Sequence, residues 1–452
     1  MNDPAFETED TVDLNTQQIL LLAANHDLQG LKPFLRIPGN ASVQDPETGY
    51  TPLHAAIGAC GQYDATRAKG AEKDSSKGIS QTENIGSGNG VEADDGKDEV
   101  VDIGAVKAVV QELFLSGAIW NDLDKNDETP GCLAWRLGWK DLYELCVEAG
   151  VRAEVLLGLL GNYEELESGD EDEEDTEVAA DAAMGDEASD ENSAMKGIQE
   201  EETQEETKAK RDVNSEDYLS SNLHIENNNL LDSDNNGVMM TWETEIMQQT
   251  VDLLKPSSPS PDGPRVLNIG FGLGIIDTIF QNLTPAPQTH HIVEAHPDVL
   301  SSLSSPSHAF GPTWSSSTTS ANQILPGKWQ SVIPQVIEQG QKYDIIYFDT
   351  FGEDYAQLKL FFQEYVPELL DDGGVFGFFN GLGADRRVCY DVYKRVVEID
   401  MEECGMGVEW VNVDVGEEVA GKKEGEGEWK GVRRRYWVLD EYRLPICRML
   451  TE

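Results

Sequence analysis

A glycine-rich turn between two apolar runs constrains this chain more than any other feature. Residues 266–277 read VLNIGFGLGIID: a buried strand runs into glycines at positions 270, 272 and 274, and then into the apolar start of a helix. Glycine suits such a turn because a side chain would hold the backbone away from a ligand, while the free N–H groups of the new helix point outward at its mouth. The pattern predicts a nucleotide-binding turn.

A second strand supports this interpretation. Residues 290–294, HHIVE, end in Glu294, twenty residues beyond Gly274. A carboxylate at the end of a neighbouring strand is placed to accept both ribose hydroxyls of a nucleotide. Since NAD, FAD and S-adenosylmethionine enzymes all use glycine-rich turns, these two motifs leave dinucleotide and S-adenosylmethionine binding open.

Strands and helices alternate through the C-terminal half of the chain. Further strands are expected at 343–350, 375–380, 408–415 and 435–439, and helices at 332–338, 358–370 and 388–401. This alternation predicts an α/β fold with a mostly parallel doubly wound sheet, whose terminal hairpin forms an antiparallel edge. Ligands bind at the carboxyl ends of the strands in such a sheet, which brings Glu294, Asp349 and Asn380 to one edge. Phe271, Trp329 and Met247 are candidates to sandwich an adenine there.

Residues 1–160 are expected to form a separate α-helical domain. Two helices are predicted within 14–36, and TPLHAA at 51–56 closely matches the ankyrin signature, in which His54 is structural. A degraded copy, ETPGCLAW, follows at 128–135, and its Thr-Pro step lies 78 residues after the first. Because one ankyrin period is about 33 residues, we attribute the excess to a disordered insertion at about 61–99. This ankyrin-repeat-like domain would bind a protein or cap the next domain.

Charge separates the domains and limits the partners. Residues 161–216 are so rich in acidic residues that a disordered linker is expected. The whole chain has 33 basic and 85 acidic residues and a net charge of −52, which disfavours nucleic acid and anionic membranes and favours basic proteins. No apolar run of about 18 residues and no signal peptide pattern is present, so an intracellular protein is expected. Six cysteines without a CxxC pair predict no metal site.

Six segments, some of which include the motifs above, carry a family resemblance. They are VMMTWETEIM, GFGLGIIDTIFQ, IVEAHPD, GKWQ, YDIIYFDTFGEDY and FFNGLGADR. In order and spacing they resemble the fungal protein arginine N5-methyltransferases, type IV enzymes that methylate the internal (delta) nitrogen of arginine, and more distantly guanidinoacetate N-methyltransferase. The resemblance implies a Rossmann-like class I S-adenosylmethionine-dependent methyltransferase domain at 217–452, preceded by the ankyrin-like part.

The resemblance also implies the residues that bind S-adenosyl-L-methionine, the co-substrate. They are Tyr218, Met239, Met247, Phe271, Gly272, Leu273, Gly274, Ile275, Ile276, Glu294, Ala295, His296, Trp329, Gln330 and Asp349. Relatives often carry methionine where this chain has Leu273, a swap of similar volume. His296 is expected to contact adenosine through its backbone.

The acids of WETE and FDTFGED suit chemistry on a guanidine. Arginine keeps its proton to a pKa above about 12, so an enzyme must hold the planar cation with carboxylates and draw charge from one nitrogen. By analogy with the guanidinoacetate enzyme, Glu243 and Asp349 take this catalytic role. Glu353 and Asp354 are secondary candidates that fit loop caps equally well, and Glu245 is expected to be an exposed helix residue.

The leading hypothesis is monomethylation of the delta (N5) nitrogen of arginine residues in protein substrates. Alternatives are a methyltransferase of small guanidino compounds such as guanidinoacetate, an NAD-dependent oxidoreductase, and an ankyrin scaffold on an inactive domain. Basic substrates such as ribosomal or nucleic-acid-binding proteins are expected, without direct binding of nucleic acid or membrane. We expect a monomer, and the family implies a location in cytoplasm and nucleus.

Overall fold

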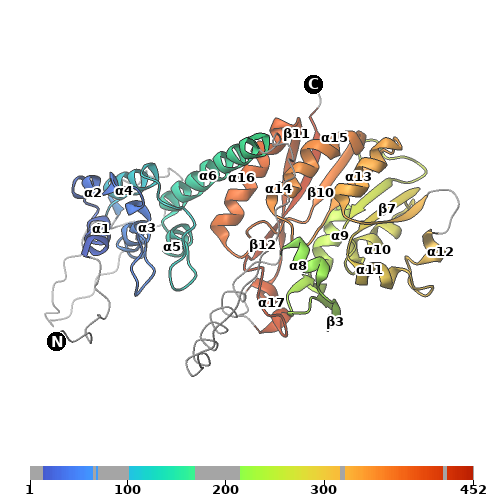
Figure 1. Ribbon diagram of the computed structural model, residues 1–452, viewed down its shortest axis with the longest axis horizontal. Coiled ribbons are helices and arrows are strands. Elements are labelled where there is room, and N and C mark those ends of the chain that lie inside the picture. The colour runs from blue at the N-terminus through green and yellow to red at the C-terminus, as the bar shows by residue number, and fades with distance from the viewer. Residues whose placement is uncertain are drawn as a thin grey trace, which may run out of the picture. The chain divides into compact units, whose positions relative to one another are not determined.

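The computed structural model describes residues 14–64, 68–69, 101–167, 214–315, 321–420 and 425–450 (Figure 1). Its contacts divide the chain into two compact units, Met1–Val155 with Arg386–Arg395, and Leu156–Asp385 with Val396–Glu452. Most of the insertion expected at about 61–99 and most of the linker expected at 161–216 lie outside the described residues. Among the helices that the structure describes, none is long and apolar enough to cross a membrane.

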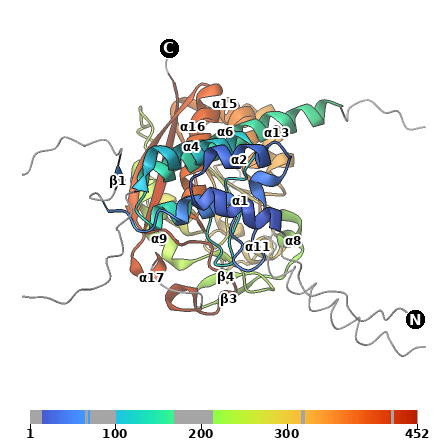
Figure 2. The ribbon, with the colours of Figure 1, turned by 90° about the vertical axis from the view of Figure 1, so that its left-hand side faces the viewer.

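The N-terminal unit is built from helices. They are α1 (Leu14–Ala24), α2 (Leu28–Leu35), the 3-10 turn η1 (Asn40–Ser42), α3 (Pro52–Gly58), α4 (Ile103–Leu115), α5 (Pro130–Arg136) and α6 (Lys140–Glu167). The two-residue strands β1 (Ala68–Lys69) and β2 (Val101–Asp102) pair in parallel. Figure 2 shows α1 and α2 side by side, and these two helices confirm the helical pair predicted within 14–36.

The two Thr-Pro steps begin helices in the same way. Thr51 caps α3, and the backbone N–H of Cys132 donates to Oγ1 of Thr129 at 3.1 Å at the start of α5. Proline follows both caps, at a position where a helix has no partner for a backbone N–H. The buried His54 ring lies 2.9 Å from the carbonyl oxygen of Glu128 through Nε2, and contacts Thr51 through Nδ1. His54 therefore ties the two steps together, which confirms its structural role.

The first half of α16 (Arg387–Glu403) also belongs to the N-terminal unit. A Cβ atom placed on Gly131 would lie 2.6 Å from Cγ2 of Val388, and one on Gly150 would lie 2.6 Å from Cγ2 of Val392. Such an approach between backbone and side chain requires glycine. The hydroxyl of Tyr143 donates a hydrogen bond to Asp391 in the same contact. The unit is therefore completed by a segment that lies far away in the sequence.

Helices extend into both ends of the range 161–216, where the acidic linker is expected. α6 continues through Glu167 rather than ending before residue 161, and α8 (Ser215–Ser220) begins within the expected linker. Asn214 caps α8 by accepting a hydrogen bond from the backbone N–H of Asp217 at 2.8 Å. A local cap of this kind can start a short helix beside an acidic segment.

A seven-stranded sheet organises the second unit, in the order β11-β12-β10-β9-β6-β7-β8. The strands are β6 (Arg265–Ile269), β7 (Thr289–Glu294), β8 (Asn322–Pro326), β9 (Tyr343–Phe348), β10 (Leu370–Phe378), β11 (Met406–Asp414) and β12 (Glu441–Met449). Neighbours from β8 to β10 pair in parallel, and β12 pairs antiparallel with both β10 and β11. The predicted parallel sheet with an antiparallel hairpin is confirmed.

The strand prediction has two errors, one strand that does not form and one that was not predicted. The final strand expected at 435–439 is wrong, because β12 begins only at Glu441. Strand β8 was not predicted, since its sequence, NQILP, is short and lies at the sheet edge after a serine-rich stretch. Of the residues before β12, Tyr436 contacts Glu243.

Helices and a small sheet surround the strands. They include the turn η2 (Thr241–Glu243), α9 (Thr244–Leu253), α10 (Ile275–Gln281), α11 (Pro297–Leu303), α12 (Pro312–Ser315), α13 (Trp329–Glu338), α17 (Glu417–Ala420) and the turn η4 (Gly427–Trp429). The helix expected at 358–370 is divided into α14 (Tyr355–Leu360), the π-helical turn η3 (Phe361–Tyr365) and α15 (Val366–Leu369). Pro367 lacks an N–H, which accounts for the irregular turn before it.

The small sheet contains β3 (His224–Glu226), β4 (Asn229–Leu231) and β5 (Gly237–Met239). β4 and β5 pair antiparallel, and Asp232 fixes the loop between them by accepting a hydrogen bond from the backbone N–H of Asn236 at 2.8 Å. The chain continues directly from β5 into η2 and α9. The hairpin therefore positions Glu243.

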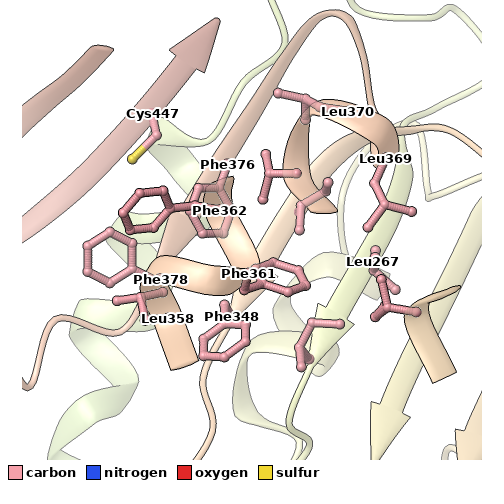
Figure 3. Packing of buried hydrophobic residues seen from close by; sticks show 14 of the residues in the cluster. Leu267, Phe348, Leu358, Phe361, Phe362, Leu369, Leu370, Phe376, Phe378 and Cys447 are labelled. Atoms are coloured by element: carbon pink, nitrogen blue, oxygen red, sulfur yellow. The ribbon is translucent and has the colours of Figure 1, made fainter. Parts of the chain in front are cut away.

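The main hydrophobic core packs against β9 and β10. Figure 3 shows Phe348, Phe361, Phe362, Phe376 and Phe378 gathered there, and each is at most 5% exposed. Burying one such side chain contributes roughly 1.5–3 kcal/mol relative to leaving it in water. This core holds the central strands rigidly, so that their carboxyl ends form a fixed edge for a site.

Candidate active site

The glycine turn has the conformation that its sequence predicts. Gly270, Gly272 and Gly274 have φ angles of 94°, 54° and 67°, in the region where only glycine is free of strain. A Cβ atom on Gly270 would overlap the carbonyl oxygen of Asp349. The backbone N–H of Asp349 also donates to the carbonyl oxygen of Ile269 at 2.8 Å. The turn after β6 therefore lies directly beside the end of β9.

A buried network of polar side chains supports the glycine turn. The amide nitrogen of Asn268 donates to the carbonyl oxygen of Gly270 at 2.7 Å and to Oδ2 of Asp277 at 2.8 Å. Nε2 of His290 lies 2.8 Å from the other oxygen of Asp277. Burial raises the pKa of the Asp277 carboxyl, while the His290 partner opposes this shift. These residues join β6, α10 and β7 behind the turn, a role that no single motif indicated.

Glu294 lies against the turn, at the carboxyl end of β7. Its Oε2 accepts a hydrogen bond from the backbone N–H of Phe271 at 2.9 Å, and its Oε1 accepts one from the N–H of His296 at 2.6 Å. The side chain is buried. The strand order thus brings together two motifs that the sequence analysis assigned to one ligand.

Other expected contacts surround the same turn. Sδ of Met239 accepts from the backbone N–H of Leu273 at 3.2 Å, and Met247 is fully buried in α9. The Tyr218 ring lies 4.7 Å from the His296 ring, and burial, with the carboxylates of Glu294 and Asp349, raises the pKa of its hydroxyl. Ile275 and Ala295 are partly exposed and Ile276 is buried. The structure brings these residues to one end of the sheet.

The His296 ring has structural partners. Its Nε2 lies 3.1 Å from the carbonyl oxygen of Tyr218, and its Nδ1 accepts from the backbone N–H of Asp298 at 3.1 Å, which caps α11. The ring is 1% exposed. A role as a general base is therefore not supported.

The two rings expected to sandwich an adenine pack against other side chains. Trp329 packs edge-on against Phe348 and Phe361, with ring centroids 5.8 and 5.4 Å apart, whereas Phe271 packs against Phe310 in a separate cluster. Both rings are at most 3% exposed because protein side chains cover them. Both aromatic side chains belong to hydrophobic clusters, and the indole nitrogen of Trp329 donates a hydrogen bond to Glu353.

Glu353 binds the loop after β9 to the start of α13. It accepts hydrogen bonds from Nε1 of Trp329 at 2.9 Å, from Nε2 of Gln330 at 2.9 Å and from Oγ1 of Thr350 at 2.7 Å. Asp354 caps α14 by accepting from the N–H of Gln357 at 3.2 Å. Both secondary candidates therefore have structural roles, and Glu245 is exposed as expected.

Two acids remain at the centre of the site. Glu243 is 3% exposed, and its Oε1 accepts from the backbone N–H of Met240 at 3.1 Å and from the hydroxyl of Tyr436. Asp349 follows β9, and its Oδ2 is buried without a hydrogen-bond partner among the residues that the structure describes. An ionised carboxylate in such a place is costly unless a ligand supplies donors or positive charge.

The electrostatics agree with this geometry. Burial, with the neighbouring Asp349 carboxylate adding to the effect, raises the pKa of Glu243 to about 8, although the hydrogen bonds from Tyr436 and Met240 oppose the shift. Burial also raises the pKa of Asp349 to about 7, with the Asp277 carboxylate adding to the effect. Acids whose pKa values are raised can bind a cation in place of their protons. The site therefore suits a positively charged ligand.

Sequence analysis missed the tyrosines around these acids. Tyr436 contacts Glu243 from the stretch RRRYWVL, whose apolar and aromatic residues indicated a strand. Tyr347 lies in β9, and its hydroxyl is buried without a hydrogen-bond partner within the described ranges. Burial raises the pKa of this hydroxyl, and Asp349 and Glu243 add to the effect. The described residues include no group of three or more His, Cys, Asp or Glu side chains that could hold a metal ion.

Comparisons with known proteins match this chain to methyltransferases. Residues 203–403 match the family model of guanidinoacetate N-methyltransferase. Among solved structures, a crystal structure of Aeropyrum pernix fibrillarin with natively bound S-adenosyl-L-methionine is 13% identical, covers 51% of this chain and 83% of that chain, and has a TM-score of 0.29.

Much closer similarity extends along the whole chain. Protein arginine N-methyltransferase 2 of Gibberella zeae is 48% identical over 94% of this chain and 90% of its own length. The protein of the same name from Neurospora crassa is 45% identical over 96% of this chain and 95% of its own length. Since the identity includes both the glycine-turn half and the helical N-terminal half, this chain belongs to the protein arginine N-methyltransferase 2 family.

Proposed function

We propose that this protein transfers a methyl group from S-adenosyl-L-methionine to an arginine side chain of a protein substrate. The observation that carries the proposal is a pair of acids beside the glycine turn, the buried Glu243 and the half-buried Asp349, whose Oδ2 is buried. Their raised pKa values suit a cationic ligand, and the guanidinium group is the cation that the names of the relatives suggest.

The residues at the turn fit S-adenosyl-L-methionine. The three glycines leave the backbone bare, and the Glu294 carboxylate lies beside them, where it would accept the ribose hydroxyls. Asp349 and Tyr218 would border the amino acid part of the ligand. When bound, S-adenosyl-L-methionine supplies an electrophilic methyl group on a positively charged sulfur.

Glu243 and Asp349 would hold the guanidine. Oε1 of Glu243 already accepts two hydrogen bonds, so Oε2 is left for a substrate N–H, and Oδ2 of Asp349 is ready for another. Methylation of a guanidinium releases one proton as the new N–C bond forms. A carboxylate whose pKa is about 7 is well matched to accept that proton at neutral pH.

We propose the internal (delta, N5) nitrogen as the methyl acceptor. Acids from two separate segments can each bind one terminal nitrogen of the guanidinium, because each terminal nitrogen carries two N–H donors. The internal nitrogen carries a single N–H, so it can accept only one methyl group. Monomethylation follows from that choice of nitrogen.

We propose basic proteins as substrates, including ribosomal or nucleic-acid-binding proteins. The net charge of −52 favours such partners and disfavours direct binding of nucleic acid or membranes. The N-terminal unit, with its paired Thr-Pro helix starts, would be an ankyrin-repeat-like platform that binds the substrate or caps the catalytic unit. We expect a monomer located in cytoplasm and nucleus.

Mass spectrometry tests the reaction and the nitrogen together. The protein is incubated with isotopically labelled S-adenosyl-L-methionine and cell extract, and the hydrolysed products are compared with delta- and omega-methylarginine standards. Label in delta-monomethylarginine, absent with Asp349→Asn, supports the proposal. Label in omega-methylarginine would contradict the choice of nitrogen, and no label in arginine would contradict the function.

The match to the guanidinoacetate N-methyltransferase model favours one alternative substrate, a small guanidino compound. The same assay with guanidinoacetate separates the two substrates. Turnover of guanidinoacetate with no labelled protein would replace the protein-substrate proposal.

A further inference from the structure

Tyr436 reaches the acid pair from a part of the chain remote from it. It precedes β12 and donates a hydrogen bond through its hydroxyl to Oε1 of Glu243, 193 residues away in the sequence. Burial raises the pKa of this hydroxyl, with the Glu243 carboxylate adding to the effect, so the tyrosine stays protonated and can donate to Glu243.

The hydrogen bond orients Glu243. Its Oε1 also accepts from the N–H of Met240 at 3.1 Å, which fixes the side chain against its own backbone. With both donors on one oxygen, the plane of the carboxylate is set and Oε2 remains for another partner. A carboxylate held by one donor alone could rotate between orientations, and a loose functional group loses much of its effect.

Tyr436 is itself held firmly in place. The Trp429 ring lies perpendicular to it with centroids 5.0 Å apart, and the Trp242 ring lies 6.0 Å away. A Cβ atom on Gly237 would approach Cε1 of Tyr436 to 3.0 Å, so the ring lies over bare backbone of β5.

The segment that carries Tyr436 is docked on the same hairpin. The backbone N–H of Arg433 donates to the carbonyl oxygen of Asn235 at 2.8 Å, and its guanidinium lies 3.6 Å from the Asp234 carboxylate. The hairpin that leads into Glu243 therefore also supports the tyrosine. Residues 433–439 lie against this hairpin and do not pair with a strand of the large sheet, which explains why the strand expected at 435–439 does not form.

We propose that Tyr436 is a positioning residue, which holds Glu243 so that its Oε2 is available to the substrate guanidine. This proposal rests on the proposed function of the site, because it assigns the tyrosine a part in binding the arginine side chain. Its hydroxyl also stabilises the ionised form of Glu243 against the effect of burial. Loss of the hydroxyl should therefore impair both the orientation and the ionisation of Glu243.

The test compares Tyr436→Phe with Tyr343→Phe in the full-length protein. Tyr343 is a matched control, because its hydroxyl is buried and bonded to Nδ1 of His291 at 2.7 Å, away from the acid pair. For each variant, kcat/KM for an arginine peptide is measured between pH 6 and 9, together with the melting temperature and the affinity for S-adenosylhomocysteine.

We expect Tyr436→Phe to lower kcat/KM roughly 10- to 100-fold, the value of a hydrogen bond to a charged group. The acidic limb of its pH profile should move to higher pH, because removal of the donor raises the pKa of Glu243. Affinity for S-adenosylhomocysteine should stay within about twofold, since Tyr436 does not contact the glycine turn, and Tyr343→Phe should keep the wild-type acidic limb.

Two results would overturn the role of Tyr436. One is a folded Tyr436→Phe protein with wild-type kcat/KM and an unmoved acidic limb. The other is a loss that Tyr343→Phe matches, which would mean a general effect of losing a buried hydroxyl. If the wild-type protein failed to methylate arginine, the proposed function itself would fall, and the two failures are therefore distinct.

Discussion

Among the described residues, Oδ2 of Asp349 is buried without a hydrogen-bond partner at the end of the central strand, and replacement of this residue tests the chemistry of the site. Asp349→Asn keeps the shape of the side chain but removes its negative charge and its ability to accept a proton. We expect turnover to fall more than roughly 100-fold. The melting temperature should not fall at pH 8, because an amide avoids the cost of burying a charge. A folded variant with normal turnover would refute the assigned role.

The acid pair also predicts how stability depends on pH. Burial raises the pKa of Glu243 to about 8 and that of Asp349 to about 7, so the folded protein without ligand holds protons that the unfolded chain releases. The stabilising effect of these protons is complete below the unfolded values and is lost as pH rises through about 7 and 8. The free energy of unfolding should fall by about 1–4 kcal/mol between pH 5.5 and 8.5.

Urea unfolding at pH 5.5, 7.0 and 8.5 measures this dependence. Glu243→Gln serves as the comparison, because glutamine cannot titrate and should flatten the decline. Equal slopes in the two proteins would show that Glu243 does not hold a proton in the folded state.

Glu294 tests the cofactor site separately from the acid pair. Glu294→Ala removes a buried carboxylate that accepts from the turn at Phe271 and would accept from a ribose. The affinity for S-adenosyl-L-methionine should fall by more than about 1 kcal/mol, the value of a hydrogen bond to a charged group. Isothermal titration calorimetry gives the change, and a dissociation constant equal to that of wild type would argue against contact with the ribose.

The elements that the sequence predicted well are those with strong local patterns. The glycine turn at 270–274 and the apolar strands at 266–269 and 343–348 form where expected, because a short apolar run bounded by glycine or a polar residue has few alternatives in a parallel sheet. Glu294 and Asp349 could be placed at one edge because parallel strands end on the same side.

The elements that failed depend on distant contacts. The strand expected at 435–439 has apolar and aromatic residues, but Tyr436 and Trp437 pack beside η2 rather than in the sheet. Trp329 was expected to contact the ligand because it lies near the carboxyl end of a strand, and in the structure Phe348 and Phe361 pack against its ring. Local sequence spacing does not predict these ring contacts, because each joins residues that are far apart in the chain.

The close contact between α6 and α16 at Gly150 predicts the effect of replacing this glycine. Gly150→Ala would put a Cβ atom 2.6 Å from Val392 and 3.0 Å from Trp120, and such overpacking costs about 1–3 kcal/mol. Gly58→Ala in α3 is the matched control, because its nearest neighbour would be 3.6 Å away and alanine favours a helix by about 0.5–1 kcal/mol. The two variants should shift the urea midpoint in opposite directions, and a stabilised Gly150→Ala would contradict this packing.

At the scale of the whole molecule, charge should govern the encounter with substrate. A net charge of −52 attracts a basic protein over distances comparable to the Debye length, about 10 Å at 0.1 M salt. The value of kcat/KM for a basic protein should therefore fall severalfold as salt rises from 50 to 300 mM. A peptide with the same target arginine but no net charge is the control, and an equal salt effect on both would argue against electrostatic attraction.

The central claim is that Glu243 and Asp349 together hold a guanidine beside the glycine turn. The most direct measurement is a crystal structure of the protein with S-adenosylhomocysteine and an arginine peptide. We expect the adenosine ribose at Glu294 and the guanidine between the two acids, with its internal nitrogen toward the sulfur. A guanidine bound elsewhere, or Glu243 and Asp349 turned away from the sulfur, would contradict it.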